Sequence, residues 1–413
     1  MLQIRPYLMD GALRSSELLD AAGVTRETLA NAYRREAGQV LRFGQARATR
    51  YAARQSLPGL DTDELPVFRV DEGGNIRPAG QLVTLVATES VWLPDPTVID
   101  GLPPEMHDVA PRGFLGRSYA RQNSELGLRE DVTGWSDNHV LIALSRRGED
   151  LPGNLVIGRE SFGRYQQLQH KVHTAGDFPR LAADAIAGEH VGSSAGGEQP
   201  KFTAFVDGQH RIVKFATDAT DNARRWRDLL LLEHIALQTL HDAGIDAAQT
   251  DLVDIDGLRC LVVERFDRVG EMGRQQVVTL AATAENVGGS WTDSAQQMHR
   301  RGEFSDEGLR RVAVLDAYGA LIANTDRHHY NVSLYPTDGG YRVAPAFDQL
   351  PMAYAPPASG NLRNEAARQP HAAVNTLAVW EEAHALARQF WCRAADEQMT
   401  ESMQHIIRAH INR

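Results

Sequence analysis

The residues best suited to chemistry in this sequence lie in two short stretches. The first, NTDRHHYNVSL (324–334), holds Asp326, two histidines and Asn331, and the second, YRVAPAFDQL (341–350), places a lone carboxylate, Asp348, after an apolar run. So many acceptor groups in a small space repel one another unless a cation lies between them. The pattern therefore indicates a cation site, and its spacing indicates which cation.

Asp326 and Asn331 have the D-x-x-x-x-N spacing of a protein-kinase catalytic loop. In that loop the aspartate accepts the proton of the attacking hydroxyl and the asparagine binds a metal ion. VSLY and YRVAPAF flank the turn PTDGG, which predicts a hairpin that returns the chain and places Asp348 beside the same site. Asp348 would be the main ligand of Mg²⁺, which prefers hard oxygen donors. This reading predicts magnesium bound with a nucleoside triphosphate.

Lys214 and Glu233 form a second candidate pair. Lys214 lies inside the apolar strand RIVKFA, where an ammonium group needs a partner. The next segment, 221–243, predicts a helix with an apolar stripe, and Glu233 falls on the face of that stripe. Protein kinases use such a strand lysine and helix glutamate to hold the phosphates of ATP. Judged alone, the two residues fit a snorkelling lysine and a glutamate at the rim of the core equally well.

A stretch of small residues precedes Lys214. In VGSSAGGEQPKF (191–202), Gly196 and Gly197 let backbone N–H groups approach a ligand, and Ser194 adds a hydroxyl donor, which suits a phosphate. Alone this signal is weak, because glycines before a hairpin are usually turn formers and the loop is neither G-x-G-x-x-G nor a Walker A sequence. Two strands joined by an Asp207–Gly208 turn are expected to follow.

CLVVERFDRVG (260–270) is an apolar strand that runs into a charged cluster. In a two-lobed nucleotide kinase this segment would be the hinge, whose backbone contacts adenine. By itself it could equally be an edge strand with an ion cluster at the surface.

Two other interpretations of the 324–350 region remain open. In a divalent-metal hydrolase or nuclease, the metal ligands would be Asp326, His328, His329 and Asp348. That function explains the histidines better but leaves the glycine loop and the lysine–glutamate pair without a role. In the other interpretation, the segment is a polar loop that follows a helix in 305–324.

The bulk composition sets the frame for these motifs. With 413 residues, 42% hydrophobic and 23% charged, the chain is expected to form two or three core-containing units. No apolar run approaches the roughly 18 residues of a membrane span, and the N-terminus lacks the order of a signal peptide, so we expect a cytoplasmic protein with no membrane partner. Cys260 and Cys392 are too few and too far apart for a zinc module or a disulfide framework, and both are expected to be buried or inert.

The first 55 residues differ in charge from the rest of the chain. They hold nine arginines and five acidic residues, a net charge of +4, whereas the whole chain carries −11. Ser16 and Thr25 are expected to cap two short helices separated at Gly23, and VLRFGQARATRYAA predicts a two-stranded wing. This segment resembles the winged-helix family of DNA-binding domains.

By that resemblance, the second helix would face the major groove and the wing would contact phosphates. The expected DNA-binding residues are Arg26, Asn31, Arg34 and Arg35 on the helix, and Arg42, Arg47 and Arg50 in the wing. The other reading of this segment is a solvated basic surface or a dimerisation unit.

The order of the motifs SSAGGEQPKF, VKF, ERFDR, NTDRHHYNVSL and APAFDQL resembles the HipA family of serine/threonine kinases, the toxins of bacterial toxin–antitoxin systems, over about residues 65–410. The basic leader resembles the HipH (YjjJ-like) branch, which carries its own winged helix. The segment after the hinge departs from the family pattern, so the resemblance does not assign the protein substrate.

The resemblance implies roles for individual residues. Asp326 would be the catalytic base, Asn331 and Asp348 the Mg²⁺ ligands, and Lys214, paired with Glu233, the phosphate-binding lysine. The phosphate loop would comprise Gly196, Gly197, Glu198, Gln199 and Lys201, and the adenine hinge Glu264, Arg265 and Phe266. Ser194 matches the serine that family members phosphorylate in their own glycine-rich loop, and His328 would support the catalytic loop.

These observations predict an α+β, multidomain protein. Its parts would be a winged helix-turn-helix (1–55), a mixed α/β subdomain (66–165) and a two-lobed, HipA-like kinase domain (182–410) with a mostly helical C-lobe. The expected function is ATP- and Mg²⁺-dependent phosphorylation of a protein, with DNA binding in cis and an antitoxin or a homodimer as partner. The alternative is a DNA-binding transcriptional regulator whose kinase-like part binds nucleotide without turnover.

Overall fold

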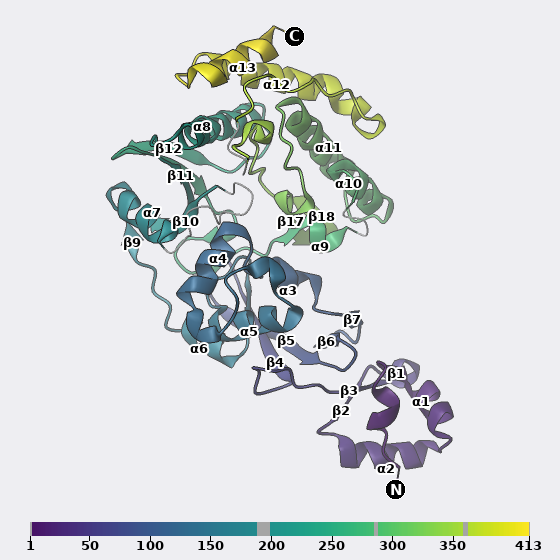
Figure 1. Cartoon of the computed structure of the whole chain (residues 1–413). Coiled ribbons are helices and arrows are strands. Elements are labelled where there is room, and N and C mark those ends of the chain that lie inside the picture. Colours follow the sequence, from purple (N-terminus) through teal and green to yellow (C-terminus); the bar gives the residue numbers. More distant parts are fainter. Residues whose placement is uncertain (1, 188–198, 285–287, 358–361, 413) are drawn as a thin grey trace. The chain divides into compact units, whose positions relative to one another are not determined.

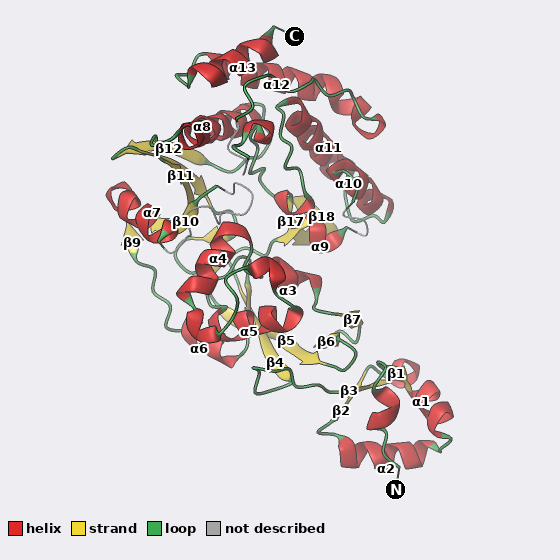
Figure 2. Ribbon diagram, in the orientation of Figure 1, coloured by secondary structure: helices red, strands yellow, loops and turns green. Residues whose placement is uncertain are grey.

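The computed structural model of the chain describes residues 2–187, 199–284, 288–357 and 362–412 (Figure 1). The chain divides into two compact units. One comprises Met1–Val70, Asn75–Arg112 and Tyr119–Leu168, and the other comprises Asp71–Gly74, Gly113–Ser118 and Gln169–Arg413. Both units mix helices and strands (Figure 2), as expected of an α+β protein.

The first unit begins with two short helices and a small sheet. Helix α1 (Ser15–Ala22) ends at Gly23, which adopts the left-handed conformation with φ of 62°, and α2 (Arg26–Glu36) begins after Thr25, whose side chain accepts from Thr28 N. The break and the Thr25 cap are therefore confirmed. Ser16 does not cap α1, because the helix already begins at Ser15.

The hairpin predicted after α2 is present. Strands β2 (Val40–Phe43) and β3 (Arg50–Ala53) pair antiparallel, and β1 (Leu13–Arg14) adds to the free edge of β3. Buried apolar side chains from the helices and the sheet, including Leu18, Leu29 and Val40, form one core cluster.

A five-stranded sheet follows in the same unit, in the order β7-β6-β5-β4-β8. Its strands are β4 (Glu64–Val70), β5 (Ile76–Thr84), β6 (Glu89–Leu93), β7 (Val98–Asp100) and β8 (Leu155–Ile157). The helices of this part are α3 (Pro104–Asp108), α5 (Asp137–Arg147) and α6 (Arg159–Tyr165), and α4 (Gly113–Gln122) runs from the second unit into the first.

The second unit begins with another five-stranded sheet, in the order β12-β13-β11-β10-β9. Its strands are β9 (Val172–His173), β10 (Lys201–Val206), β11 (Gln209–Ala216), β12 (Thr250–Ile255) and β13 (Leu258–Glu264). The Asp207–Gly208 turn joins β10 to β11, as predicted. Helix α7 (Phe178–Ile186) contributes Phe178 to the core under this sheet, and α8 (Asp221–Asp242) follows β11 along the chain.

The rest of the second unit is mainly helical. Short strands β14 (Arg268–Val269), β15 (Gly273–Arg274) and β16 (Val278–Thr279) lead into α9 (Leu280–Thr283), α10 (Trp291–Arg300) and α11 (Asp306–Leu321). The predicted hairpin is formed by β17 (Ser333–Thr337) and β18 (Gly340–Val343), and α12 (Trp380–Ala395) and α13 (Glu401–Ile411) end the chain. No helix in the described ranges is long and apolar enough to cross a membrane.

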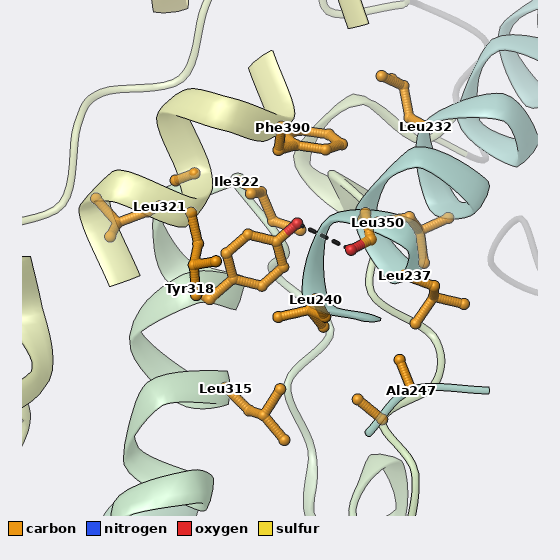
Figure 3. Close-up of a cluster of buried hydrophobic side chains, with 14 of the residues drawn as sticks. Leu232, Leu237, Leu240, Ala247, Leu315, Tyr318, Leu321, Ile322, Leu350 and Phe390 are labelled. Atoms are coloured by element: carbon orange, nitrogen blue, oxygen red, sulfur yellow. Dashed lines mark hydrogen bonds between the residues drawn. The ribbon is translucent and has the colours of Figure 1, made fainter. Parts of the chain in front are cut away.

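The core of the second unit joins helices that are far apart in the sequence. Leu237 of α8, Leu315 of α11 and Phe390 of α12 are all buried in one cluster (Figure 3). Tyr318 of α11 is fully buried, and its hydroxyl donates to Ala236 O of α8 at 3.2 Å. This packing sets the position of α8, which carries Glu233, and of α11, which ends shortly before the loop that carries Asp326 and Asn331.

Both cysteines are free thiols. Cys260 is buried, and burial raises the pKa of its thiol to about 11. Cys392 is exposed, so it is not buried, and its inertness stays a prediction.

Candidate active site

Lys214 and Glu233 form a buried ion pair. Lys214 lies in β11, opposite Leu261 of β13 and Lys201 of β10. Its side chain therefore projects from the central strand of the sheet. Its Nζ lies 2.6 and 2.9 Å from the two carboxylate oxygens of Glu233 on α8. The two residues are 6% and 0% exposed. The alternative of a snorkelling lysine and a glutamate at the rim is therefore wrong.

Asp348 completes a three-residue charge cluster, because its Oδ1 also accepts from Lys214 Nζ. Its backbone has a φ of 52°, a left-handed conformation that costs a non-glycine residue roughly 1–2 kcal/mol. The surrounding contacts must therefore hold this carboxylate in place. One of them is Asn324 Nδ2, which donates to Asp348 O at 3.2 Å.

The charges in this cluster shift one another's pKa. Burial opposes the charged form of Lys214, but Asp348 and Glu233 together raise its pKa above the usual value. Burial raises the pKa of Asp348, but Lys214 and Lys201 outweigh it and lower the pKa to about 2. Burial also raises the pKa of Glu233. We nevertheless treat Glu233 as ionised, because the ammonium group 2.6 Å away stabilises its charged form.

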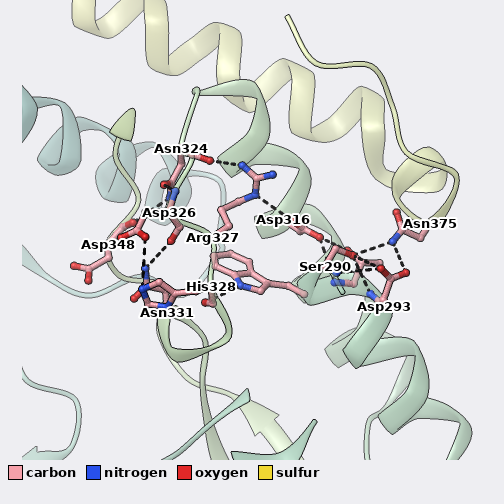
Figure 4. A network of polar contacts seen from close by, with 12 residues as sticks. Ser290, Asp293, Asp316, Asn324, Asp326, Arg327, His328, Asn331, Asp348 and Asn375 are labelled. Carbon is pink, nitrogen blue, oxygen red and sulfur yellow. Dashed lines mark hydrogen bonds and ion pairs between the residues drawn. The ribbon is translucent and has the colours of Figure 1, made fainter. Parts of the chain in front are cut away.

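Asp326 and Asn331 lie in one tight loop, as their spacing predicts. Asn331 Nδ2 donates to Asp326 O at 2.8 Å, and the side chain of Asp326 is 51% exposed. Figure 4 shows Asp326, Asn331 and Asp348 together on one side of a polar network. The structure therefore brings together the three oxygen-bearing side chains that the sequence singled out.

Asn324 joins the two segments that carry these residues. Its Oδ1 accepts from Asp326 N at 3.0 Å, while its Nδ2 bonds to Asp348 O. The residue is only 1% exposed. Sequence reasoning gave Asn324 no role, because both of its partners are backbone atoms, which leave no trace in a pattern of side chains.

Three further residues of α10 and α11 hold the loop from behind. Trp291 Nε1 donates to His328 O at 3.0 Å, Ser294 Oγ lies 2.8 Å from His329 Nε2, and Asp316 Oδ1 accepts from Arg327 Nε at 3.2 Å. These contacts were not predicted. The one feature of the sequence that could have indicated such a contact is Asp316 itself, a lone acid in the apolar run VAVLDAYGAL.

The histidines do not form the ligand set of a metallohydrolase. His329 is 4% exposed and faces Ser294, and burial lowers its pKa, which favours the neutral form. His328 Nε2 lies 3.7 Å from Asp326 Oδ1. Within the described ranges, no group of three or more His, Cys, Asp and Glu side chains is placed to hold a metal ion. The ligand set Asp326, His328, His329 and Asp348 is therefore not supported.

The predicted phosphate loop is described only at its end. Ser194, Gly196, Gly197 and Glu198 lie outside the described residues. Gln199 is 8% exposed, and its Nε2 donates to Phe215 O at 2.5 Å, which ties the end of the loop to β11. Lys201 begins β10 opposite Lys214, and its charge acts on Asp348.

The predicted hinge follows a central strand. Strand β13 lies between β12 and β11, so the edge-strand alternative is wrong. The N–H groups of Glu264 and Arg265 donate to Gln249 O and His210 O, so neither can donate to a base. The guanidinium of Arg265 is buried in a bidentate pair with Asp267, at 2.9 and 2.8 Å.

Phe266 lies close to two aromatic residues. Its ring centroid lies 5.5 Å from that of Phe347, the neighbour of Asp348. Its carbonyl accepts from Tyr335 Oη at 3.3 Å.

The seven basic and polar residues predicted to bind DNA lie on α2 and the β2–β3 hairpin. All are exposed except Arg50, which is half-buried. Arg34 Nη1 donates to Asn31 Oδ1 at 2.6 Å, and Arg35 Nη2 donates to Leu2 O at 3.4 Å.

Comparison with known proteins identifies relatives of the whole chain. Residues 61–166 match the family model of the YjjJ-like toxin middle domain, and residues 193–412 match that of the HipA-like C-terminal domain. The chain is 35% identical over 432 aligned positions to Toxin YjjJ of Escherichia coli (strain K12), and the alignment covers 98% of this chain and 96% of the relative.

The fold also matches a solved structure. It is similar to a chain in the complex of the toxin–antitoxin system HipA, HipB and its operator DNA from Shewanella oneidensis MR-1, with a TM-score of 0.56 and 16% identity. The match covers 84% of this chain and 95% of the other. The similarity establishes a shared mixed α+β multidomain fold.

Proposed function

The chain belongs to the family of HipA-like and YjjJ-like toxins, as its motif order predicts, and from this premise we propose that it is an ATP- and Mg²⁺-dependent serine/threonine protein kinase. One observation carries the proposal. A buried lysine–glutamate pair lies in contact with Asp348, and Asn324 bonds to the backbone of both Asp348 and Asp326. Kinases use a strand lysine paired with a helix glutamate and a metal-binding aspartate to hold a nucleotide, and a loop aspartate to accept a hydroxyl proton.

The residues present fit a divalent cation. Lys214 carries one positive charge against the two carboxylates of Glu233 and Asp348, so the three together have an excess negative charge. Asp348 and the side-chain oxygen of Asn331 are the ligands we assign to Mg²⁺, which prefers oxygen donors. When bound, Mg·ATP supplies the transferable phosphoryl group and neutralises charge that develops on it.

The side chains of this chain then have separate tasks. Lys214 holds the phosphates with its ammonium group, and Glu233 keeps that group charged and pointed into the site. Asp326 is half-exposed and accepts the proton of a serine or threonine hydroxyl. Asn324 keeps Asp326 and Asp348 in register through their backbones. The remaining nucleotide contacts are assigned to Gln199, Lys201, the carbonyl groups of Glu264 and Arg265, and Phe266.

We further propose that residues 1–55 form a winged helix that binds DNA. The exposed arginines on α2 and the hairpin support this role, because they present positive charge from two adjacent elements. An antitoxin or a second copy of the chain is the proposed protein partner, and Ser194 is the candidate for autophosphorylation.

Incubation with γ-labelled ATP and Mg²⁺ tests the kinase proposal. We expect the wild type to incorporate label into itself or into a protein of the cell extract, and Asp326→Ala to lose it while it still binds ATP. Asp306→Ala is a matched control, because Asp306 is an exposed acid at the start of α11. If the wild type binds ATP without transferring label, the alternative holds, namely a DNA-binding regulator with an inactive kinase-like domain. Unchanged labelling by Asp326→Ala would remove this residue as the base.

A further inference from the structure

Among the described residues, helices α10 and α11 hold one side of the catalytic loop. Three consecutive residues, Arg327, His328 and His329, each contact a different residue of α10 or α11. Figure 4 shows the first of these contacts, between Arg327 and Asp316. The residues on either side of this run, Asp326 and Tyr330, are exposed. The loop therefore has a fixed rear face and an open face, and Asp326 belongs to the open face.

Asp316 is the charged member of the rear face. It is 6% exposed, although it carries a carboxylate in the middle of an apolar helix. Its Oδ2 accepts from Thr292 N at 3.2 Å and from Thr292 Oγ1 at 2.8 Å, in the first turn of α10. Its Oδ1 accepts from Arg327 Nε at 3.2 Å, and Arg327 Nη1 in turn donates to Asn324 O.

We propose that Asp316 is a positioning residue for phosphoryl transfer. It holds Arg327, and thereby the backbone next to Asp326, against the N-terminus of α10. The inference rests on the kinase function proposed above and extends it, because Asp316 acts through the loop and touches neither nucleotide nor hydroxyl. An offset of about 1 Å at a reacting group can lower a rate about 100-fold, so such a support matters for turnover.

A carboxylate is needed at this position because it faces donors on both sides. Thr292 presents an N–H and a hydroxyl, and Arg327 presents a guanidinium. Asparagine has nearly the same shape as aspartate, but only one of its two terminal atoms accepts a hydrogen bond. Asp316→Asn must therefore turn its NH2 group toward either Thr292 or Arg327 and lose one of the two contacts.

The test compares Asp316→Asn with Arg327→Gln, Arg327→Lys and the double variant Asp316→Asn/Arg327→Gln. We expect Asp316→Asn and Arg327→Gln each to lower kcat about 10- to 100-fold, with KM for ATP within about two-fold of wild type. The double variant should be no slower than the slower of the two single variants, because both changes break the same contact, that between Asp316 and Arg327. Arg327→Lys retains the charge and should recover part of the rate.

Asp293→Asn is the matched control. Asp293 lies in the same first turn of α10, but its hydrogen bonds within the described part of the chain go to Ser290 and Asn375 and not to the catalytic loop. We expect its kcat to equal that of the wild type. A kcat of Arg327→Gln or Asp316→Asn within two-fold of wild type would overturn the proposal, and Arg327→Gln decides it if Asp316→Asn does not fold.

Hydrogen exchange separates this proposal from the kinase function itself. The amides of 326–331 should exchange faster in Asp316→Asn than in wild type, and they should be unchanged in Asp293→Asn. If the wild type transfers no phosphate but this difference appears, the kinase function fails and the support of the loop stands. If the wild type is active and exchange is equal in all variants, the positioning role fails.

Discussion

Lys214 Nζ lies 2.6 Å from Glu233 Oε1, across 19 positions of sequence, and both residues are buried. A buried ion pair of this kind is weak evidence for stability, because both charges lose their hydration. Its position next to Asp348 fits the proposed nucleotide, whose phosphates need a fixed ammonium group.

We expect Lys214→Met to weaken ATP binding at least about ten-fold and to destabilise the protein by about 3 kcal/mol, because Glu233 is left buried without its partner. Calorimetric titration with Mg·ATP and urea unfolding measure the two effects. Arg211→Met is the control on the same strand, because its pair with Glu264 is partly exposed and contributes at most about 1 kcal/mol. Equal losses of ATP affinity and of stability in Lys214→Met and Arg211→Met would contradict a special role of Lys214.

The close packing of α11 against the loop that carries Asp326 gives a second prediction. A Cβ atom at Gly319 would lie 2.7 Å from Arg327 Cδ, and the guanidinium group of Arg327 is held by Asp316 and Asn324. Gly319→Ala should therefore displace the loop, lower kcat about ten-fold or more and cost about 1–3 kcal/mol of stability.

The same helix provides the control for this change. At Gly308 of α11, the nearest atom to an added Cβ lies 3.5 Å away, which is ordinary contact. Gly308→Ala should keep the wild-type kcat and raise the unfolding temperature, because alanine favours the helix. A Gly319→Ala variant with wild-type turnover would show that the loop tolerates the displacement.

The sequence predicted the charged pairs better than the contacts that align them. Lys214 and Glu233 were found because a charge on an apolar strand or stripe demands a partner. Asn324 and Trp291 were missed because they bond to backbone atoms, and no periodicity of side chains encodes such a bond. Asp316, like Glu233, is a lone acid on an apolar helix, which predicts a buried partner. That partner, Arg327, lies in a polar loop, where an arginine is common and does not by itself indicate a contact.

The hinge shows a similar limit. The motif ERFDR placed charges after an apolar strand, and the alternatives were a hinge and a surface cluster. The sequence did not indicate that Arg265 would fold back onto Asp267, two residues on, and become buried with it. Nor did it reveal that sheet bonds would use two of the N–H groups, since strand order depends on contacts between distant segments.

His210 gives a prediction for pH. Burial lowers the pKa of His210 to about 4, although the bond to Glu271 O opposes the shift, and His170, Arg265 and Arg268 add to it. The unfolded chain protonates this group near pH 6.5, so protonation favours unfolding. The contribution of neutral His210 to the free energy of unfolding should therefore be fully present above pH 6.5. It should be lost as the pH drops from 6.5 toward 4.

Between pH 7.5 and 5, the protonation of His210 should lower the free energy of unfolding by about 2 kcal/mol. Urea unfolding of wild type and His210→Gln at the two pH values measures it as the difference between the two pH dependences. Histidines that do not contact His210 contribute equally to both proteins and cancel, and His170, whose ring centroid lies 4.4 Å from that of His210, is the exception. Identical pH dependences would show that His210 takes up its proton as easily in the folded protein as in the unfolded chain.

DNA binding by the N-terminal segment gives the last prediction. Arg34 and Arg35 are exposed on α2, in the position from which we propose that the helix contacts DNA. Each phosphate contact releases counterions, so log K should fall with log salt with a slope of about −0.9 for each contact. Arg34→Ala/Arg35→Ala should weaken binding and reduce the magnitude of the slope by up to about 2, as measured by fluorescence anisotropy with duplex DNA at several salt concentrations.

Arg54→Ala is the matched control, because it removes an arginine from the same segment whose charge is already compensated. Arg54 Nη1 lies 2.9 Å from Glu64 and 3.6 Å from Asp63, and the side chain is 18% exposed. Its loss should leave the salt slope unchanged. If the double variant keeps the wild-type slope and affinity, the basic helix does not contact phosphate, and dimerisation through this segment becomes the better account, which sedimentation of the same two variants would then test.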